Sequence, residues 1–159
     1  MITKNLPDAV KSDGTKVPYE TGKGYNLGIA TYSIDVSMPD AVNSTVHVTW
    51  DGSAAGTVNY QDSNLPAFKS ESAPYTDSSG AVDVSIKDTT NGNWIAQNMT
   101  SGAITTSSGA TVSGSTLTIT GGTAGGARFD IVGQSRRARI QITLSAGGVV
   151  RVHPNGKQA

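Results

Sequence analysis

The chain has 159 residues and a formal net charge of zero, and 36% of its residues are hydrophobic, which fits one globular domain. Because the chain has no cysteine, a disulfide framework and a cysteine-based metal site are both excluded. Nineteen glycines stand among many threonines and serines, a composition typical of short strands joined by turns.

Residues 1–27 differ from the rest, because they combine two prolines, four lysines and three glycines without any alternation. We interpret them as an extended N-terminal arm that precedes a domain over residues 28–159. Such an arm is either disordered or laid across a neighbour. The apolar side chains that could anchor it are Leu6, Val10, Val17, Tyr19 and Tyr25. These anchors favour docking over disorder.

The first ten residues, MITKNLPDAV, lack the charged and then apolar layout of a signal peptide. No apolar run approaches the length needed to span a bilayer. We therefore expect a protein made in a cytoplasm, with no membrane partner.

From residue 28 onward, apolar and polar residues alternate in short runs that end at turn residues, which predicts strands. In STVHVTW (44–50), for example, every second residue is apolar. The residues expected to face inward along the chain are Ala30, Tyr32, Ile34, Val36, Met38, Val46, Val48, Trp50, Val58, Tyr60, Val82, Val84, Ile86, Ile104, Leu117, Ile119, Phe129, Ile131, Ile140, Ile142, Leu144, Val150 and Val152.

Two hairpins are predicted from loop length and from the inward sets. The first joins residues 44–50 to residues 57–61 through DGSAAG. The second pairs Leu144 with Val150 around the loop AGG (146–148), so that both inward sets stay on one face. In that register Arg151 would face Thr143, and His153 would face Gln141.

The whole pattern gives roughly nine or ten strands and no run with helical periodicity. Strands at this spacing predict an all-β fold, an antiparallel β-sandwich or jelly roll that carries the N-terminal arm.

Charge is divided unevenly along the chain. Residues 1–88 hold six lysines against eleven acids, and residues 89–159 hold five arginines and one lysine against one aspartate. The arginines are Arg128, Arg136, Arg137, Arg139 and Arg151. The alternation puts Arg128, Arg139 and Arg151 on outer positions and the other two at the entrance to the last hairpin, which predicts a basic patch.

Arginine suits an acidic protein surface, because its planar group forms two-pronged hydrogen bonds to carboxylates and it is enriched at interfaces. Zero net charge and the lack of neighbouring exposed aromatics argue against nucleic acid. Ordinary outward charge that prevents edge-to-edge aggregation is the remaining alternative.

Catalytic chemistry has little support in the sequence. His47 and His153 are expected to point outward from different strands, and no HExxH, GxSxG or P-loop motif is present. We expect no enzyme, no cofactor and no metal. Trp94 and Tyr75 could stack on sugar rings if they lie at a loop mouth, although core or interface packing is the favoured role for these aromatics.

Three segments resemble structural proteins of tailed-bacteriophage particles. They are VHVTWDGSAAGTVNYQDSN, NGNW and SRRARIQITLSAGGVVRVHPNGK. In that group, a strand that ends near a tryptophan leads into a GT strand. An R-x-R strand, a glycine turn and a final strand with a GK tail follow later. The resemblance covers roughly residues 44–64 and 91–157.

The resemblance implies a jelly-roll domain that is part of a virion. We expect a non-enzymatic capsid cement or decoration subunit that binds the major capsid protein or other virion proteins. Symmetric particles present repeated sites, so a homo-oligomer, a dimer or trimer, is the expected form. A tail or baseplate component that binds a host glycan is the alternative.

Overall fold

The computed structural model describes residues 2–3, 6–38, 41, 43–63, 95–96, 104–132 and 137–157. Throughout these ranges the regular secondary structure is β-strand, and no helix occurs in them. The described part of the chain accordingly contains no helix long and apolar enough to cross a membrane. The prediction of an all-β chain is confirmed.

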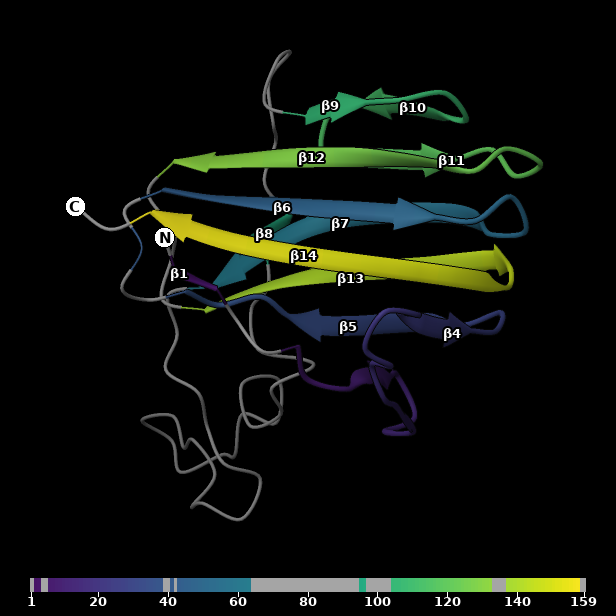
Figure 1. Ribbon diagram of the computed structural model, residues 1–159, viewed down its shortest axis with the longest axis horizontal. Coiled ribbons are helices and arrows are strands. Elements are labelled where there is room, and N and C mark those ends of the chain that lie inside the picture. The colour runs from purple at the N-terminus through teal and green to yellow at the C-terminus, as the bar shows by residue number, and fades with distance from the viewer. Residues whose placement is uncertain are drawn as a thin grey trace, which may run out of the picture.

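The strands form two antiparallel sheets that pack face to face as a β-sandwich (Figure 1). Sheet A has six strands, and five of them follow the order β1-β14-β6-β12-β9. Their bounds are β1 Ile2–Thr3, β14 Gly148–Lys157, β6 Asn43–Trp50, β12 Gly125–Val132 and β9 Ile104–Thr106. The sixth strand, β4 (Tyr25–Leu27), pairs with the first residues of β14.

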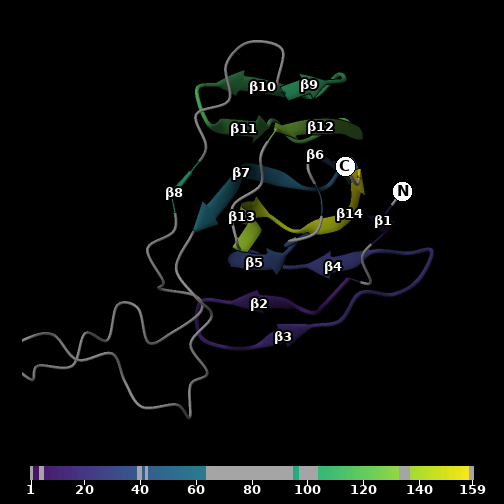
Figure 2. The ribbon, with the colours of Figure 1, turned by 90° about the vertical axis from the view of Figure 1, so that its left-hand side faces the viewer.

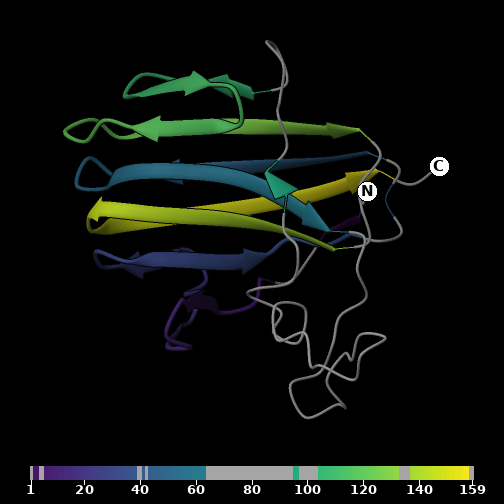
Figure 3. The same ribbon diagram turned by 180° about the vertical axis from the view of Figure 1, so that it is seen from behind.

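Sheet B has eight strands, and seven of them follow the order β10-β11-β7-β13-β5-β2-β3 (Figure 3). Their bounds are β10 Ala110–Ser113, β11 Thr116–Ile119, β7 Ala55–Ser63, β13 Arg137–Ala146, β5 Thr31–Asp35, β2 Ala9–Lys11 and β3 Lys16–Val17. The short strand β8 (Ile95–Ala96) pairs with β7.

Short connections mostly carry the chain from one sheet to the other. β6 belongs to sheet A and the next strand, β7, to sheet B, while β13 belongs to sheet B and β14 to sheet A. The pairs β4–β5, β9–β10 and β11–β12 are divided between the sheets in the same way. Figure 2 shows the two layers side by side, with successive strands at the same level in opposite layers.

Both predicted hairpins are therefore wrong. β14 pairs with β6 over eight residue pairs from Val150 to Lys157, and β13 pairs with β7 and β5. The inward sets of β13 and β14 stay inward because they face each other across the interior, instead of lying side by side in one sheet. Alternation predicts which residues are buried. It does not predict whether the next strand pairs in the same sheet or lies in the facing sheet.

The core fills the space between the sheets with the alternating residues of both. Phe129, Ile140 and Val152 are fully buried, and Trp50 closes one end at 3% exposure. Among the described residues expected to face inward, all are buried except Ala30 and Ile104, which are half-buried and pack against the core. Val82, Val84 and Ile86 lie outside the described residues.

The described part of residues 1–27 pairs with strands of its own sandwich. β2 and β3 extend sheet B beyond β5, where Val10 lies opposite Ser33. β4 joins sheet A beside β14, and β1 pairs with the far end of the same strand, Ile2 opposite Gly156. The first and last strands of the described chain, β1 and β14, therefore lie side by side (Figure 1).

Candidate functional site

Polar side chains cover the outer surface of sheet A. On β6, β12 and β14 buried residues alternate with exposed or half-exposed ones, and the latter point outward. We call this surface the polar face. Its side chains are Thr45, His47, Thr49, Thr105, Arg128, Asp130, Arg151, His153 and Asn155. The half-buried Val149 at the start of β14 is an apolar residue beside this polar surface.

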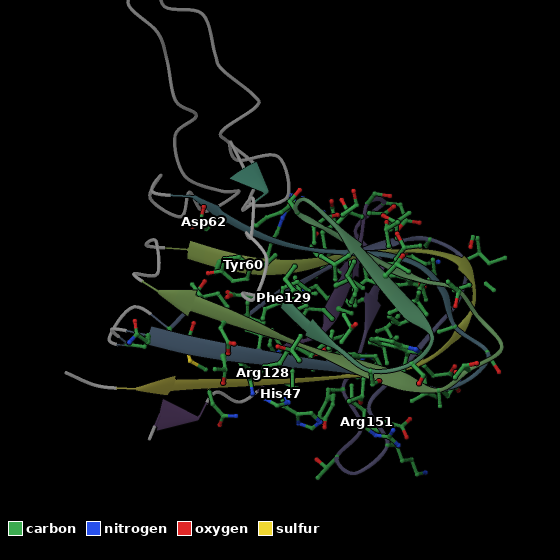
Figure 4. The ribbon with its side chains drawn as sticks, turned by 90° about the horizontal axis from the view of Figure 1, so that it is seen from above. His47, Tyr60, Asp62, Arg128, Phe129 and Arg151 are labelled. Atoms are coloured by element: carbon green, nitrogen blue, oxygen red, sulfur yellow. The ribbon has the colours of Figure 1, made fainter. Side chains whose placement is uncertain are left out.

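One row of the polar face crosses four strands. Thr105 on β9 lies opposite Arg128 on β12, Arg128 opposite His47 on β6, and His47 opposite His153 on β14. Figure 4 shows His47 and Arg128 together on the outer side of sheet A, while Phe129 and Tyr60 point toward the interior. The register thus gathers two imidazoles and one guanidinium from residues far apart in sequence.

Arg128 is held by a two-pronged ion pair to Asp130, two residues further along β12. Its Nε lies 2.9 Å from Asp130 Oδ1, and its Nη2 donates to Oδ2 at 3.0 Å. Arg128 and Asp130 keep 47% and 34% of their side-chain surfaces exposed, so the pair sits on the surface. The local charge of Arg128 is therefore largely balanced.

Arg151 lies on β14 two residues before His153, and it is opposite Thr49 on β6. Its aliphatic stem crosses Gly24, because a Cβ on that glycine would lie 2.7 Å from Arg151 Cγ. Gly24 also has a φ of 94°, a conformation that side chains disfavour. The missing side chain of Gly24 thus makes room for the Arg151 side chain, which lies on the polar face and points away from β6.

The residues of the predicted basic patch are divided between the two sheets, because the chain crosses from sheet B to sheet A between β13 and β14. Arg139 belongs to sheet B, is only 7% exposed, and donates from Nε to Gln61 Oε1 at 2.8 Å. Arg136 lies outside the described residues, and only the backbone of Arg137 is described, opposite Ser63. Among the described arginine side chains, Arg128 and Arg151 share a face, and Arg139 does not belong to it.

The predicted anchors of the N-terminal segment contact the sandwich of their own chain. Leu6, Val17 and Tyr19 are partly buried against the core, and Val10 is half-buried in β2. Tyr25 is fully buried, with its hydroxyl donating to the Pro7 carbonyl at 2.7 Å and its ring edge-on to Tyr19 at 5.1 Å. Burial raises the pKa of Tyr25, since it disfavours the phenolate. An additional contact with another chain stays a prediction.

Trp94 and Tyr75, the residues considered for sugar stacking, lie outside the described residues. Within the described ranges, no group of three or more His, Asp or Glu side chains is placed to hold a metal ion. Sequence reasoning missed the pairing of His47 with His153, since it placed Gln141 opposite His153. The outward position of both imidazoles was the available signal, but their being opposite each other depends on strand order.

Comparisons of the chain with protein-family models, with curated proteins and with solved structures found no match. The sandwich and its polar face are therefore the features from which a function can be proposed. Guanidinium, imidazole and hydroxyl groups on the outer surface of a sheet are suited to hydrogen bonding with a polar or acidic partner surface.

Proposed function

We propose that the protein is a non-enzymatic structural subunit of a bacteriophage particle, a cement or decoration subunit that binds the capsid shell. Binding would occur through the polar face, with Arg151 as its positively charged contact and with the N–H groups of Arg128 that Asp130 does not occupy as further hydrogen-bond donors. In this proposal the described residues supply a rigid β-sandwich, and a partner surface supplies the acidic groups.

One observation carries the proposal. Two of the segments with the phage-protein resemblance each form two strands joined by a short corner, with one strand in each sheet. The two strand pairs lie side by side. The first segment becomes β6, a corner and β7, and the last becomes β13, a corner and β14. β6 pairs with β14 in sheet A, and β7 pairs with β13 in sheet B. These two segments therefore form one structural unit of the sandwich. This supports treating their resemblance to phage proteins as one feature and not as separate short matches.

The strand arrangement also suits a subunit that must resist being pulled apart. The N-terminal segment contributes strands to both sheets, and β1 pairs with the last strand. Unfolding from either end must therefore break pairings with strands distant in sequence. Such a design is consistent with a protein that stabilises an assembly.

The direct test is to purify virions of the phage that encodes the chain and to measure its copy number relative to the major capsid protein. A fixed ratio across gradient fractions is expected. Absence of the protein from virions overturns the proposal. Cross-linking followed by mass spectrometry then identifies its neighbour, and contacts with tail proteins alone would favour the tail or baseplate alternative.

The role of the polar face is tested separately with Arg128→Glu combined with Arg151→Glu. This variant is expected to fold normally, because both side chains lie on the surface, and to lose occupancy on particles. The matched control is Lys11→Glu combined with Lys16→Glu, which makes the same change of charge on β2 and β3 at the edge of sheet B. Equal occupancy of both variants would remove the polar face from the proposal.

A further inference from the structure

We propose that His47 and His153 together form a binding site for a late first-row transition-metal cation such as Ni²⁺, Cu²⁺ or Zn²⁺. The two residues are directly opposite in the β6–β14 ladder, and both side chains are exposed on the polar face. Imidazole is a preferred ligand for these metals. The inference is independent of any role in a virus particle.

The ladder defines how close the two histidines are. Residues of an antiparallel strand alternate in hydrogen bonding to one neighbour and then the other. Val149 exchanges hydrogen bonds with Asp51, the residue that follows β6, so the odd-numbered residues of β14 bond toward β6. Pro154 has no N–H to donate, and it occupies an even-numbered position, where the backbone N and carbonyl are directed away from β6.

His47 and His153 are therefore a hydrogen-bonded pair, with Cα atoms about 5.5 Å apart. Side chains directly opposite in such a pair have Cβ atoms about 5 Å apart. A metal with two bonds of about 2.1 Å at a right angle needs ligand nitrogens about 3 Å apart. Two imidazoles can meet that requirement by tilting toward each other over the ladder, and the strands hold both backbones in place.

The surroundings of the pair leave room for a cation. Arg128 lies on the other side of His47, but its guanidinium is turned along β12 and paired with Asp130. Arg151 leans over Gly24, on the side of β14 away from His47. The neighbouring hydroxyl and amide side chains of Thr45 and Asn155 are polar, and the open surface lets water complete the coordination.

The test is a calorimetric titration of the tag-free protein with NiCl₂. We expect one cation per chain. Because a chelate needs both nitrogens, His47→Ala and His153→Ala should each weaken binding by about tenfold or more, which corresponds to about 1.4 kcal/mol or more. Two independent imidazoles would behave differently, since each single variant would then keep the affinity and lose half of the sites.

The matched control moves both histidines on the same face without changing composition. It combines His47→Thr, Thr49→His, His153→Asn and Asn155→His, which separates the imidazoles by four residues, about 13 Å along the strands, and places neither of them opposite a carboxylate. This variant is expected to bind no better than the single variants. Nickel binding equal to that of the native chain, in this control or in either single variant, overturns the proposal, as does the absence of binding to the native chain.

A second readout covers the case in which a variant folds poorly. In a Zn²⁺ titration of the native protein followed by NMR, resonances of both imidazoles should shift with one shared midpoint. Separate midpoints, or a shift of only one ring, contradict a shared site.

Discussion

Asp51 and Val149 exchange two hydrogen bonds and so join the two corners at one end of the sandwich. The Asp51 N–H donates to the Val149 carbonyl at 3.1 Å, and the Val149 N–H donates to Asp51 Oδ2 at 3.1 Å. Asp51 Oδ1 also accepts from the N–H groups of Ser53 and Ala54, at 3.0 and 3.2 Å. One carboxylate thus satisfies three backbone donors where β6 turns into β7 and where β14 begins.

Replacing Asp51 with alanine should destabilise the fold, because three N–H groups at a partly buried corner would lose their acceptor. From the usual contribution of hydrogen bonds to a charged group, we expect the free energy of unfolding to fall by about 2–3 kcal/mol. Chemical denaturation measures it. Asp130→Ala removes a carboxylate from a surface ion pair and should cost less than about 1 kcal/mol. Equal losses in the two variants would show that the corner bonds contribute little.

Gly56 lies on β7 opposite Leu144 of β13, next to a register shift in the pairing of these strands. Its φ is 149°, and a Cβ there would overlap the Thr143 carbonyl oxygen and lie 2.8 Å from the Leu144 Cα. Since both atoms belong to a paired backbone, Gly56→Ala should cost at least about 4 kcal/mol, a loss expected only from severe core defects.

Gly122 gives the matched comparison for Gly56, with a φ of 76° and no atom within 4 Å of an added Cβ. Gly122→Ala should therefore cost only its backbone conformation, about 1 kcal/mol. Thermal denaturation of the two variants separates steric from conformational cost. A Gly56→Ala protein as stable as the Gly122→Ala protein would contradict the close approach of β7 and β13.

The alternation of side chains predicted most of the core correctly. Val46, Val48 and Trp50 are buried as expected, because a strand with one apolar face has only one way to hide it. The sequence could not predict that β13 and β14 belong to different sheets. A short glycine loop permits either a hairpin or a crossing, and the choice depends on partners contributed by distant segments.

The same limit explains the outcome for the polar face. Arg128, His47 and His153 could each be placed outward from their own strands, but their common row depends on β12, β6 and β14 being neighbours. Arg139 was expected on the outer surface, yet it is 7% exposed and bonded to Gln61. Its burial depends on tertiary contacts that period-two alternation does not encode.

The centre of the core should be far less tolerant than the edge of sheet B. Phe129 is fully buried between the sheets, whereas Val112 on β10 is 39% exposed. Phe129→Ala should cost about 3–5 kcal/mol, because it removes buried surface and leaves a cavity. Val112→Ala should cost less than about 1 kcal/mol, mainly through strand propensity. Denaturant midpoints of the two variants test this contrast, and comparable losses would place the core elsewhere.

Tyr25 predicts a loss of stability at alkaline pH. Its folded-state pKa is raised by burial, so the folded chain keeps the phenolic proton where the unfolded chain releases it, above about pH 10. The unfolded state then binds fewer protons than the folded state, and the free energy of unfolding falls as pH rises. Below that range the contribution of the protonated group is complete.

Tyr25→Phe isolates this effect, since the other tyrosines are the same in both proteins. At neutral pH the variant should be about 1 kcal/mol less stable, because it lacks the hydrogen bond to the Pro7 carbonyl. Above about pH 10 the difference should shrink and then reverse, as only the native chain must keep a buried tyrosine protonated. Urea denaturation from pH 7 to pH 11 measures both curves. If they stay parallel across that range, Tyr25 is not held protonated by burial in the fold.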